Sequence, residues 1–134
     1  MSFLNNLPQA RVRLAVGGKQ LYGSDRSQKD TYAPLLMAIL TFRGALEDLD
    51  EEERTGCDPY EYGDLLDLWR KGDDVDILSY DTGEYGLFNR EALLADVRGV
   101  EHQVKVFVAD NLPDLRVHPE LGAYFRGESD RPWE

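Results

Sequence analysis

Residues 64–80 read DLLDLWRKGDDVDILSY, and this stretch predicts a β-hairpin. Two segments rich in apolar residues, 64–69 and 75–80, flank a polar turn that contains Gly72. Side chains alternate between the two faces of a strand. The second segment therefore places Val75, Ile77 and Ser79 on one face, and Asp76, Leu78 and Tyr80 on the other. We expect the first face to be buried and the second to carry exposed aromatic and acidic groups.

The chain downstream of this hairpin predicts a short strand and a long helix. The strand runs from Tyr85 to Phe88, after a turn at Thr82-Gly83. Residues 89–112 read NREALLADVRGVEHQVKVFVADNL, in which Asn89 is a good N-cap and Glu91 lies near the positive end of the helix dipole. Apolar positions recur every three or four residues, which indicates a buried stripe: Leu93, Val97, Val100, Val104, Phe107, Val108, Asn111 and Leu112. Glycine inside a helix costs about 1 kcal/mol, so Gly99 predicts a close packing contact.

The chain upstream of this hairpin predicts another hairpin, followed by a helix. Segments 11–16 and 19–23 flank Gly17-Gly18 and favour a first hairpin. A second amphipathic pattern predicts a helix from about Tyr32 to Leu49, with Pro34 in its first turn. Acidic residues at 50–53 oppose the helix dipole. We therefore expect a loop there, through Gly56 and Pro59.

These elements predict a single α+β domain over residues 1–134, in the order β-β-α-β-β-(β)-α. One antiparallel sheet built from two hairpins would carry both helices on one face. Residues from about 114 to 134 form an irregular tail, in which Leu121, Tyr124 and Phe125 can pack back on the body. We expect the last six residues to be loose.

The acidic residues are unevenly distributed. The formal charge of the chain is −11, with +4 in residues 1–43, −12 in residues 44–84 and −3 in residues 85–134. A strongly negative surface disfavours nucleic acid and anionic lipid, and it favours a cationic protein. No cofactor is indicated. Neither a signal peptide nor a membrane span is visible, which favours the cytoplasm.

The acidic middle third is interleaved with tyrosine, and we expect it to bind a partner. Tyrosine supplies rigid apolar area, while carboxylates pair with lysine or arginine. The candidate partner-binding residues are Asp58, Tyr60, Glu61, Tyr62, Asp64, Asp67, Asp73, Asp74, Asp76, Tyr80, Asp81, Glu84 and Tyr85. The alternative is a solvated loop, together with hairpin acids that only block edge-to-edge aggregation.

Other chemistry has less support in the sequence. Asp73, Asp74 and Asp76 supply oxygen ligands but lack the glycine and terminal glutamate of an EF-hand loop, so metal binding stays an open alternative. Cys57 has acidic neighbours, which raise the pKa of a thiol, and no pattern joins it to His102 or His118. We therefore expect no catalytic site. Trp69 reads as a residue at the edge of the core, and Trp133 as part of the tail.

Two segments resemble bacterial toxin immunity proteins, namely Asp58-Pro59-Tyr60-Glu61-Tyr62-Gly63-Asp64 and Tyr80-Asp81-Thr82-Gly83-Glu84-Tyr85. The resemblance implies a small acidic cytoplasmic inhibitor that occludes a basic nuclease or deaminase toxin. One alternative is a phage anti-defence protein that mimics DNA, for which evenly spaced acids are expected. Others are a small enzyme, and an oligomerisation domain whose long helix exposes a second apolar stripe.

Overall fold

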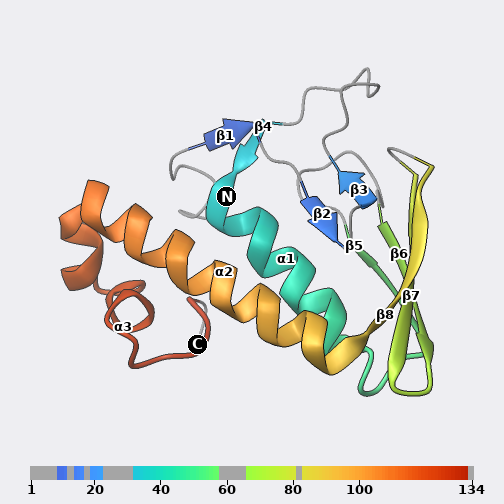
Figure 1. Ribbon diagram of the computed structural model, residues 1–134. Coiled ribbons are helices and arrows are strands. Elements are labelled where there is room, and N and C mark those ends of the chain that lie inside the picture. Colours follow the sequence, from blue (N-terminus) through green and yellow to red (C-terminus); the bar gives the residue numbers. More distant parts are fainter. Residues whose placement is uncertain are drawn as a thin grey trace.

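The computed structural model describes residues 9–11, 14–16, 19–22, 32–57, 66–80 and 83–132, and it has the predicted α+β class (Figure 1). Its strands are β1 (Gln9–Arg11), β2 (Leu14–Val16), β3 (Lys19–Tyr22), β4 (Tyr32–Pro34), β5 (Arg54–Cys57), β6 (Leu66–Lys71), β7 (Asp74–Ser79) and β8 (Tyr85–Asn89). Its helices are α1 (Leu35–Asp48), α2 (Arg90–Asn111), the 3₁₀ helix η2 (Pro113–Val117) and α3 (Gly122–Phe125).

The main sheet is antiparallel, with strand order β5-β6-β7-β8. The predicted hairpin is confirmed as β6 and β7, which are joined by Gly72-Asp73. Gly72 has φ +61°, a conformation that glycine adopts without a steric penalty. The predicted third strand is confirmed as β8, which pairs with β7 from Asp74↔Asn89 to Leu78↔Tyr85.

Strand β5 contradicts the loop expected through Gly56. Residues 54–57 pair with β6, from Arg54↔Trp69 to Cys57↔Leu66. The Thr55 hydroxyl also donates to the carbonyl oxygen of Ala45 at 2.9 Å, and Cys57 is buried. These partners lie elsewhere in the sequence, so tertiary contacts override a local pattern that favours a loop. Pro59 lies outside the described residues.

The N-terminal part confirms a hairpin and corrects the start of the first helix. Strands β2 and β3 pair antiparallel as predicted, while their Gly17-Gly18 turn lies outside the described residues. The two described ends of the predicted first strand pair with different partners, because Arg11 belongs to β1, which pairs with β4, whereas β2 pairs with β3. Residues 32–34 are therefore strand, and α1 begins at Leu35. Proline disfavours the helical conformation of the residue before it, which is consistent with the helix starting after Pro34.

Helix α2 confirms the predicted long helix and its cap. The Asn89 side chain accepts from the Ala92 amide at 2.9 Å, and Pro113 follows the helix end. Figure 1 shows α1 and α2 lying side by side in opposite directions. The end of α1 and the start of α2 meet the sheet.

The core has two halves along this helix pair. The sheet half joins both helices to β5, β6 and β7 through Leu46, Leu49, Leu68, Ile77 and Val97 among others. In the other half, Leu36, Leu40 and Val108 meet Leu115, Leu121, Tyr124 and Phe125 of the C-terminal segment. The predicted packing of the tail is therefore confirmed.

The expectation of a loose end is wrong for residues 129–132. Arg43 donates to the carbonyl oxygen of Asp130 at 3.0 Å, Arg131 pairs with Glu47 at 2.9 Å, and Pro132 is buried. Trp133 and Glu134 lie outside the described residues. The tail is thus an ordered part of the second core half as far as Pro132.

The close contact expected at Gly99 is also absent. This glycine is exposed, and a Cβ atom added to it would meet nothing within 4 Å. We predict that Gly99→Ala raises the free energy of unfolding by about 0.5–1 kcal/mol, because alanine restricts the unfolded chain and fits the helix. Urea unfolding followed by circular dichroism measures the change. Gly72→Ala is the control: it has equal space around it but positive φ, so it should destabilise. A destabilising Gly99→Ala would contradict this prediction.

Candidate functional site

The face of the main sheet that turns away from the helices forms a surface that we call the outer face. Val75, Ile77 and Ser79 of β7 are buried, whereas Asp74, Asp76 and Leu78, which alternate with them, are partly exposed. Strand pairing extends this alternation into cross-strand rows. The outer face comprises Arg54, Asp67, Trp69, Lys71, Asp74, Asp76, Leu78, Tyr80, Tyr85, Leu87 and Asn89.

The middle of the outer face is aromatic and apolar. Trp69 is 40% exposed, Tyr80 59%, Leu87 60% and Tyr85 65%. Single exposed apolar residues are ordinary, but a contiguous group marks an interaction surface. Here Leu87 shares a row with Trp69, and Tyr85 lies in the adjacent row.

Asp67 holds three side chains of the outer face in place. Its carboxylate accepts hydrogen bonds from Arg54 at 2.8 and 3.1 Å, from the Trp69 indole at 3.0 Å and from the Tyr80 hydroxyl at 3.3 Å. The Arg54 guanidinium also lies 4.8 Å from the centroid of the Trp69 ring. Asp67 is among the predicted partner-binding residues, and it is only 5% exposed. From this buried position, its carboxylate fixes the side chains of Arg54, Trp69 and Tyr80 on the outer face.

These contacts set the ionisation of Asp67. Burial alone raises the pKa of its carboxyl group, but the hydrogen bonds from Arg54 and Trp69 and the charge of Arg54 outweigh it. The pKa therefore lies below its ordinary value. The ionised form is the one that the folded protein stabilises.

This shift predicts a pH dependence. Asp67→Asn should cost about 1–3 kcal/mol at pH 7, because the hydrogen bonds to a charged acceptor are weakened. A lowered pKa contributes stability above the unfolded value of about 3.9, and that stability is lost as the pH falls through the folded value. The difference between wild type and Asp67→Asn should therefore shrink below about pH 4. Urea unfolding from pH 7 to pH 3 measures it, and a difference that grows in acid would contradict the assignment.

Asp76 occupies the centre of the outer face. It lies opposite Trp69 on β6 and opposite Leu87 on β8. Arg54 is already bound to Asp67. No basic side chain in the described part of the chain forms an ion pair with Asp76 or with its neighbour Asp74. Both carboxylates are therefore available to a cation from outside.

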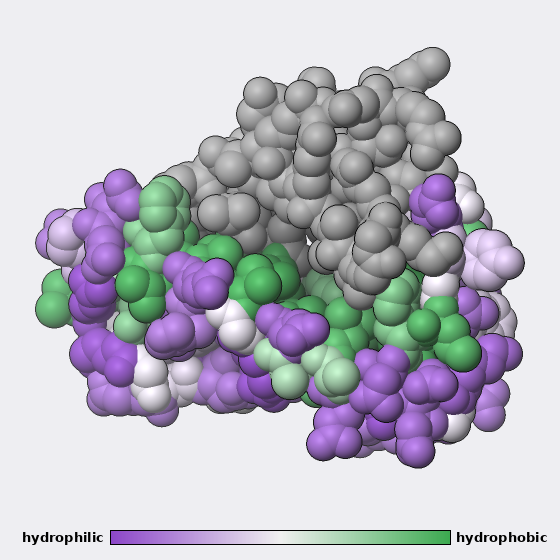
Figure 2. All heavy atoms as spheres, in the orientation of Figure 1, coloured by the Kyte–Doolittle hydropathy of each residue, from purple (hydrophilic) through white to green (hydrophobic). Residues whose placement is uncertain are grey.

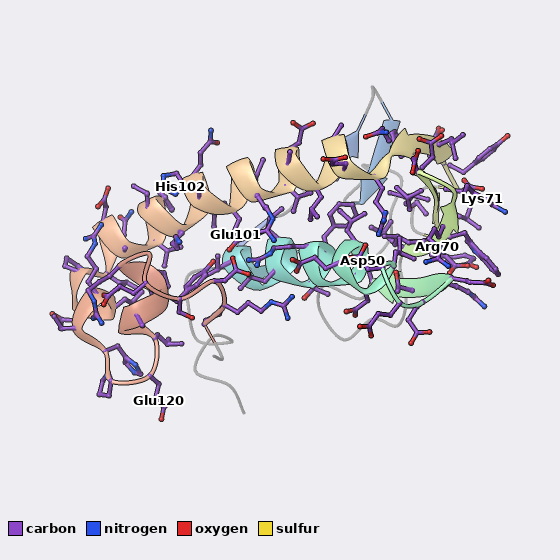
Figure 3. All side chains as sticks on the ribbon, turned by 90° about the horizontal axis from the view of Figure 1, so that it is seen from below. Asp50, Arg70, Lys71, Glu101, His102 and Glu120 are labelled. Atoms are coloured by element: carbon purple, nitrogen blue, oxygen red, sulfur yellow. The ribbon has the colours of Figure 1, made fainter. Side chains whose placement is uncertain are left out.

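One end of the sheet adds a set of carboxylates that we call the acidic rim. It consists of Asp48 at the end of α1, of Asp50, Glu51, Glu52 and Glu53 after this helix, and of Asp73 in the β6–β7 turn. Figure 2 shows hydrophilic side chains gathered at this end, at lower right. Asp50 pairs with Arg90 at 2.6 Å, and Figure 3 shows Asp50 near Arg70 at the sheet end. Much of the rim stays uncompensated, so it projects negative potential beside the outer face.

The structure describes seven of the thirteen predicted partner-binding residues. Asp67, Asp74, Asp76, Tyr80 and Tyr85 lie on the outer face, Asp73 lies in the turn and Glu84 in the β7–β8 connection. The remaining six lie outside the described residues: Asp58, Tyr60, Glu61, Tyr62, Asp64 and Asp81. Binding by all thirteen remains a prediction.

Six outer-face residues were missed as site residues: Arg54, Trp69, Lys71, Leu78, Leu87 and Asn89. Trp69 was interpreted as a core-edge residue. The alternation of β6, in which Leu66 and Leu68 are buried, could have placed it on the outer face with Asp67. No alternation pattern could place Arg54 on the outer face, because strand β5 was not predicted.

A second polar cluster, the polar junction, lies between the two core halves. Arg43 is 1% exposed and Glu101 is 5% exposed, and they pair at 2.8 Å. The Tyr124 hydroxyl donates to Glu101 at 2.6 Å, and Asp130 also binds Arg43. Burial, followed by the contact with Glu101, raises the pKa of Tyr124 far above its ordinary value. Figure 3 shows Glu101 between the two long helices.

A polar hollow of about 360 Å³ adjoins the polar junction and contains His102 and Lys105. Its cations have partners: Arg98 pairs with Glu47 at 2.8 Å, and Lys105 lies 4.6 Å from the Tyr124 ring centroid. The ring nitrogen Nδ1 of His118 accepts from the amides of Glu120 and Leu121, and Cys57 is buried in the sheet half of the core. Arg98, Lys105 and His118 therefore have structural partners in the fold.

The stripe predicted on α2 is partly wrong. Val100 is 46% exposed and Phe107 is 55% exposed, whereas Glu101 faces the core. Glu101 takes that position because Arg43 meets it there. An exposed apolar stripe on α2 is the feature expected of an oligomerisation domain.

Metal binding by Asp73, Asp74 and Asp76 gains no support. Within the described ranges, no group of three or more histidine, cysteine, aspartate or glutamate residues could hold a metal ion. Asp74 and Asp76 belong to the outer face, while Asp73 lies in the turn.

No protein-family model, curated protein or solved structure matches this chain. Among the helices that the structure describes, none is long and apolar enough to cross a membrane.

Proposed function

We propose that this chain is a binding protein that captures a cationic protein on its outer face. The observation that carries the proposal is the combination of exposed Trp69, Tyr80, Tyr85 and Leu87 with the carboxylate of Asp76, which pairs with no basic side chain among the described residues. Aromatic anchors surrounded by charge are a common arrangement at the centre of protein interfaces. The net charge of −11 selects a basic partner.

The same observations favour a stoichiometric inhibitor of the immunity type over a DNA mimic. A mimic needs acids spaced evenly along an extended surface, in place of phosphates. Here the aromatic residues form a compact centre and the acidic rim lies at one end of the sheet. A basic toxin domain, such as a nuclease or a deaminase, suits such a surface. The inhibitor would act in the cytoplasm by occluding its target, without a cofactor.

Capture from host lysate by the tagged chain tests this proposal. The chain should retain one basic protein stoichiometrically in 50 mM salt and release it in 1 M salt, because the Debye length falls to about 3 Å at 1 M. Leu87→Ser should reduce the retained amount. Val117→Ser is the matched control: it removes a side chain that is 77% exposed but lies in η2, away from the sheet. Equal retention by both variants would contradict the proposal.

Self-association through α2 is a second candidate, because Val100 and Phe107 are exposed on that helix. The net charge opposes it, since two copies repel each other. Sedimentation of the wild type and of Phe107→Ser separates the two functions. A dimer that Phe107→Ser dissociates would support self-association, while a monomer in both would exclude it.

A further inference from the structure

The outer face already shows how it binds a guanidinium group. Arg54 Nε and Nη2 reach the two oxygens of Asp67 at 2.8 and 3.1 Å. The same guanidinium lies 4.8 Å from the centroid of the Trp69 ring. A carboxylate thus binds the fork of the planar cation while an aromatic ring meets its surface. Both contacts favour arginine over the compact, strongly hydrated ammonium of lysine.

Asp76 is likewise a carboxylate next to Trp69, but no basic side chain of the described residues is bound to it. It faces Trp69 and Leu87 across the strands, and Tyr85 lies in the adjacent row. It is partly exposed, and within the described ranges no basic side chain pairs with it. A carboxylate with aromatic and aliphatic neighbours suits a cation whose flat surface can contact them.

We propose that the captured partner supplies an arginine that binds beside Asp76, with its guanidinium on the carboxylate and its side chain against Trp69 and Leu87. This inference rests on the proposed function and names the chemistry of the partner. Arg54 contributes to the selection, because it occupies Asp67 and repels a second cation there. The incoming arginine is therefore directed to Asp76.

The acidic rim has a different role in this arrangement. Glu51, Glu52 and Glu53 are exposed and lie in the α1–β5 connection and beside the first residue of β5, off the aromatic centre. Exposed carboxylates attract lysine and arginine alike and mainly speed encounter. Discrimination between the two cations therefore arises at Asp76, where the flat guanidinium gains contacts that an ammonium cannot make.

Two peptides of equal charge, hexa-arginine and hexa-lysine, test the inference by NMR titration of the whole chain at 50 mM salt. Hexa-arginine should bind about fivefold more tightly or better. The largest shifts should fall on the amides of Trp69, Asp76 and Leu87. Asp76→Asn should abolish the preference, whereas Asp74→Asn should keep it. Asp74 is the matched control because it lies on the same strand and face but opposite Lys71 and Asn89.

Three outcomes would overturn the inference: equal affinities for the two peptides, a preference that survives Asp76→Asn, or no binding of either peptide. A parallel titration with the captured partner keeps the proposed function separate. If Trp69→Ala weakens that complex and Asp76→Asn does not, capture on the outer face stands and the arginine position is wrong. If neither variant weakens it, both proposals are wrong.

Discussion

Glu101→Ala is expected to cost about 3–5 kcal/mol in the free energy of unfolding, the largest effect of any single change discussed here. The substitution removes the 2.8 Å partner of Arg43 and the acceptor of the Tyr124 hydroxyl. Arg43 is 1% exposed, so its charge cannot regain water without opening the helix pair. A domain of this size has a total stability of about 5–15 kcal/mol. Urea unfolding followed by circular dichroism measures the loss.

Two comparisons show whether the loss comes from a buried charge that has lost its buried partner and keeps only Glu47 and Asp130. Arg43→Met combined with Glu101→Leu should recover much of the stability, because the buried ions are replaced by an apolar pair while Glu47 and Asp130 keep their pairs with Arg98. Asp110→Ala breaks the exposed pair with Arg116 and should cost less than about 1 kcal/mol. A cost for Glu101→Ala as small as that for Asp110→Ala would refute the structural role of the polar junction.

Trp69→Ala is expected to weaken partner binding by about 2 kcal/mol or more, which is about 30-fold in Kd. Trp69 is the largest side chain in the middle of the outer face, and Asp67 and Arg54 hold its ring in place. A ring held before binding loses little conformational entropy in the complex. Calorimetric titration with the captured partner measures the affinity.

The fold should survive this substitution, because Trp69 is 40% exposed and lies outside both core halves. Val117→Ser should leave the affinity unchanged, although it removes a more exposed apolar side chain. Equal affinities of the wild type and Trp69→Ala would mean that the aromatic centre is not the binding surface. Loss of folding would instead make Trp69 a structural residue.

The sequence predicted the elements whose signals are local. The β6–β7 hairpin followed from alternation around Gly72, and α2 followed from the Asn89 cap and the apolar spacing before Pro113. Alternation also placed Asp76, Leu78 and Tyr80 together on the exposed face. These features need only neighbouring residues to specify them.

The errors concern contacts between distant parts of the chain. Glu101 is buried because it pairs with Arg43, which lies 58 positions earlier in the sequence. The spacing of apolar residues along the helix predicted instead that Val100 faces the core. Asp67 is buried because Arg54 and Tyr80 converge on it from two different segments. Strand β5 exists through its pairing with β6. The spacing of residues in the sequence gives no information on partners that lie so far apart along the chain. The sequence therefore predicted an exposed face with aromatic and acidic residues, but it did not predict the contacts of Asp67 that organise this face.

Hydrogen–deuterium exchange of the chain with and without its captured partner tests the central claim most directly. We predict that binding protects the amides of β6, β7 and β8, with the strongest effect around Trp69, Asp76 and Leu87, and leaves the exposed side of α2 unchanged. Protection confined to α2 around Val100 and Phe107, or to the C-terminal segment, would contradict capture on the outer face.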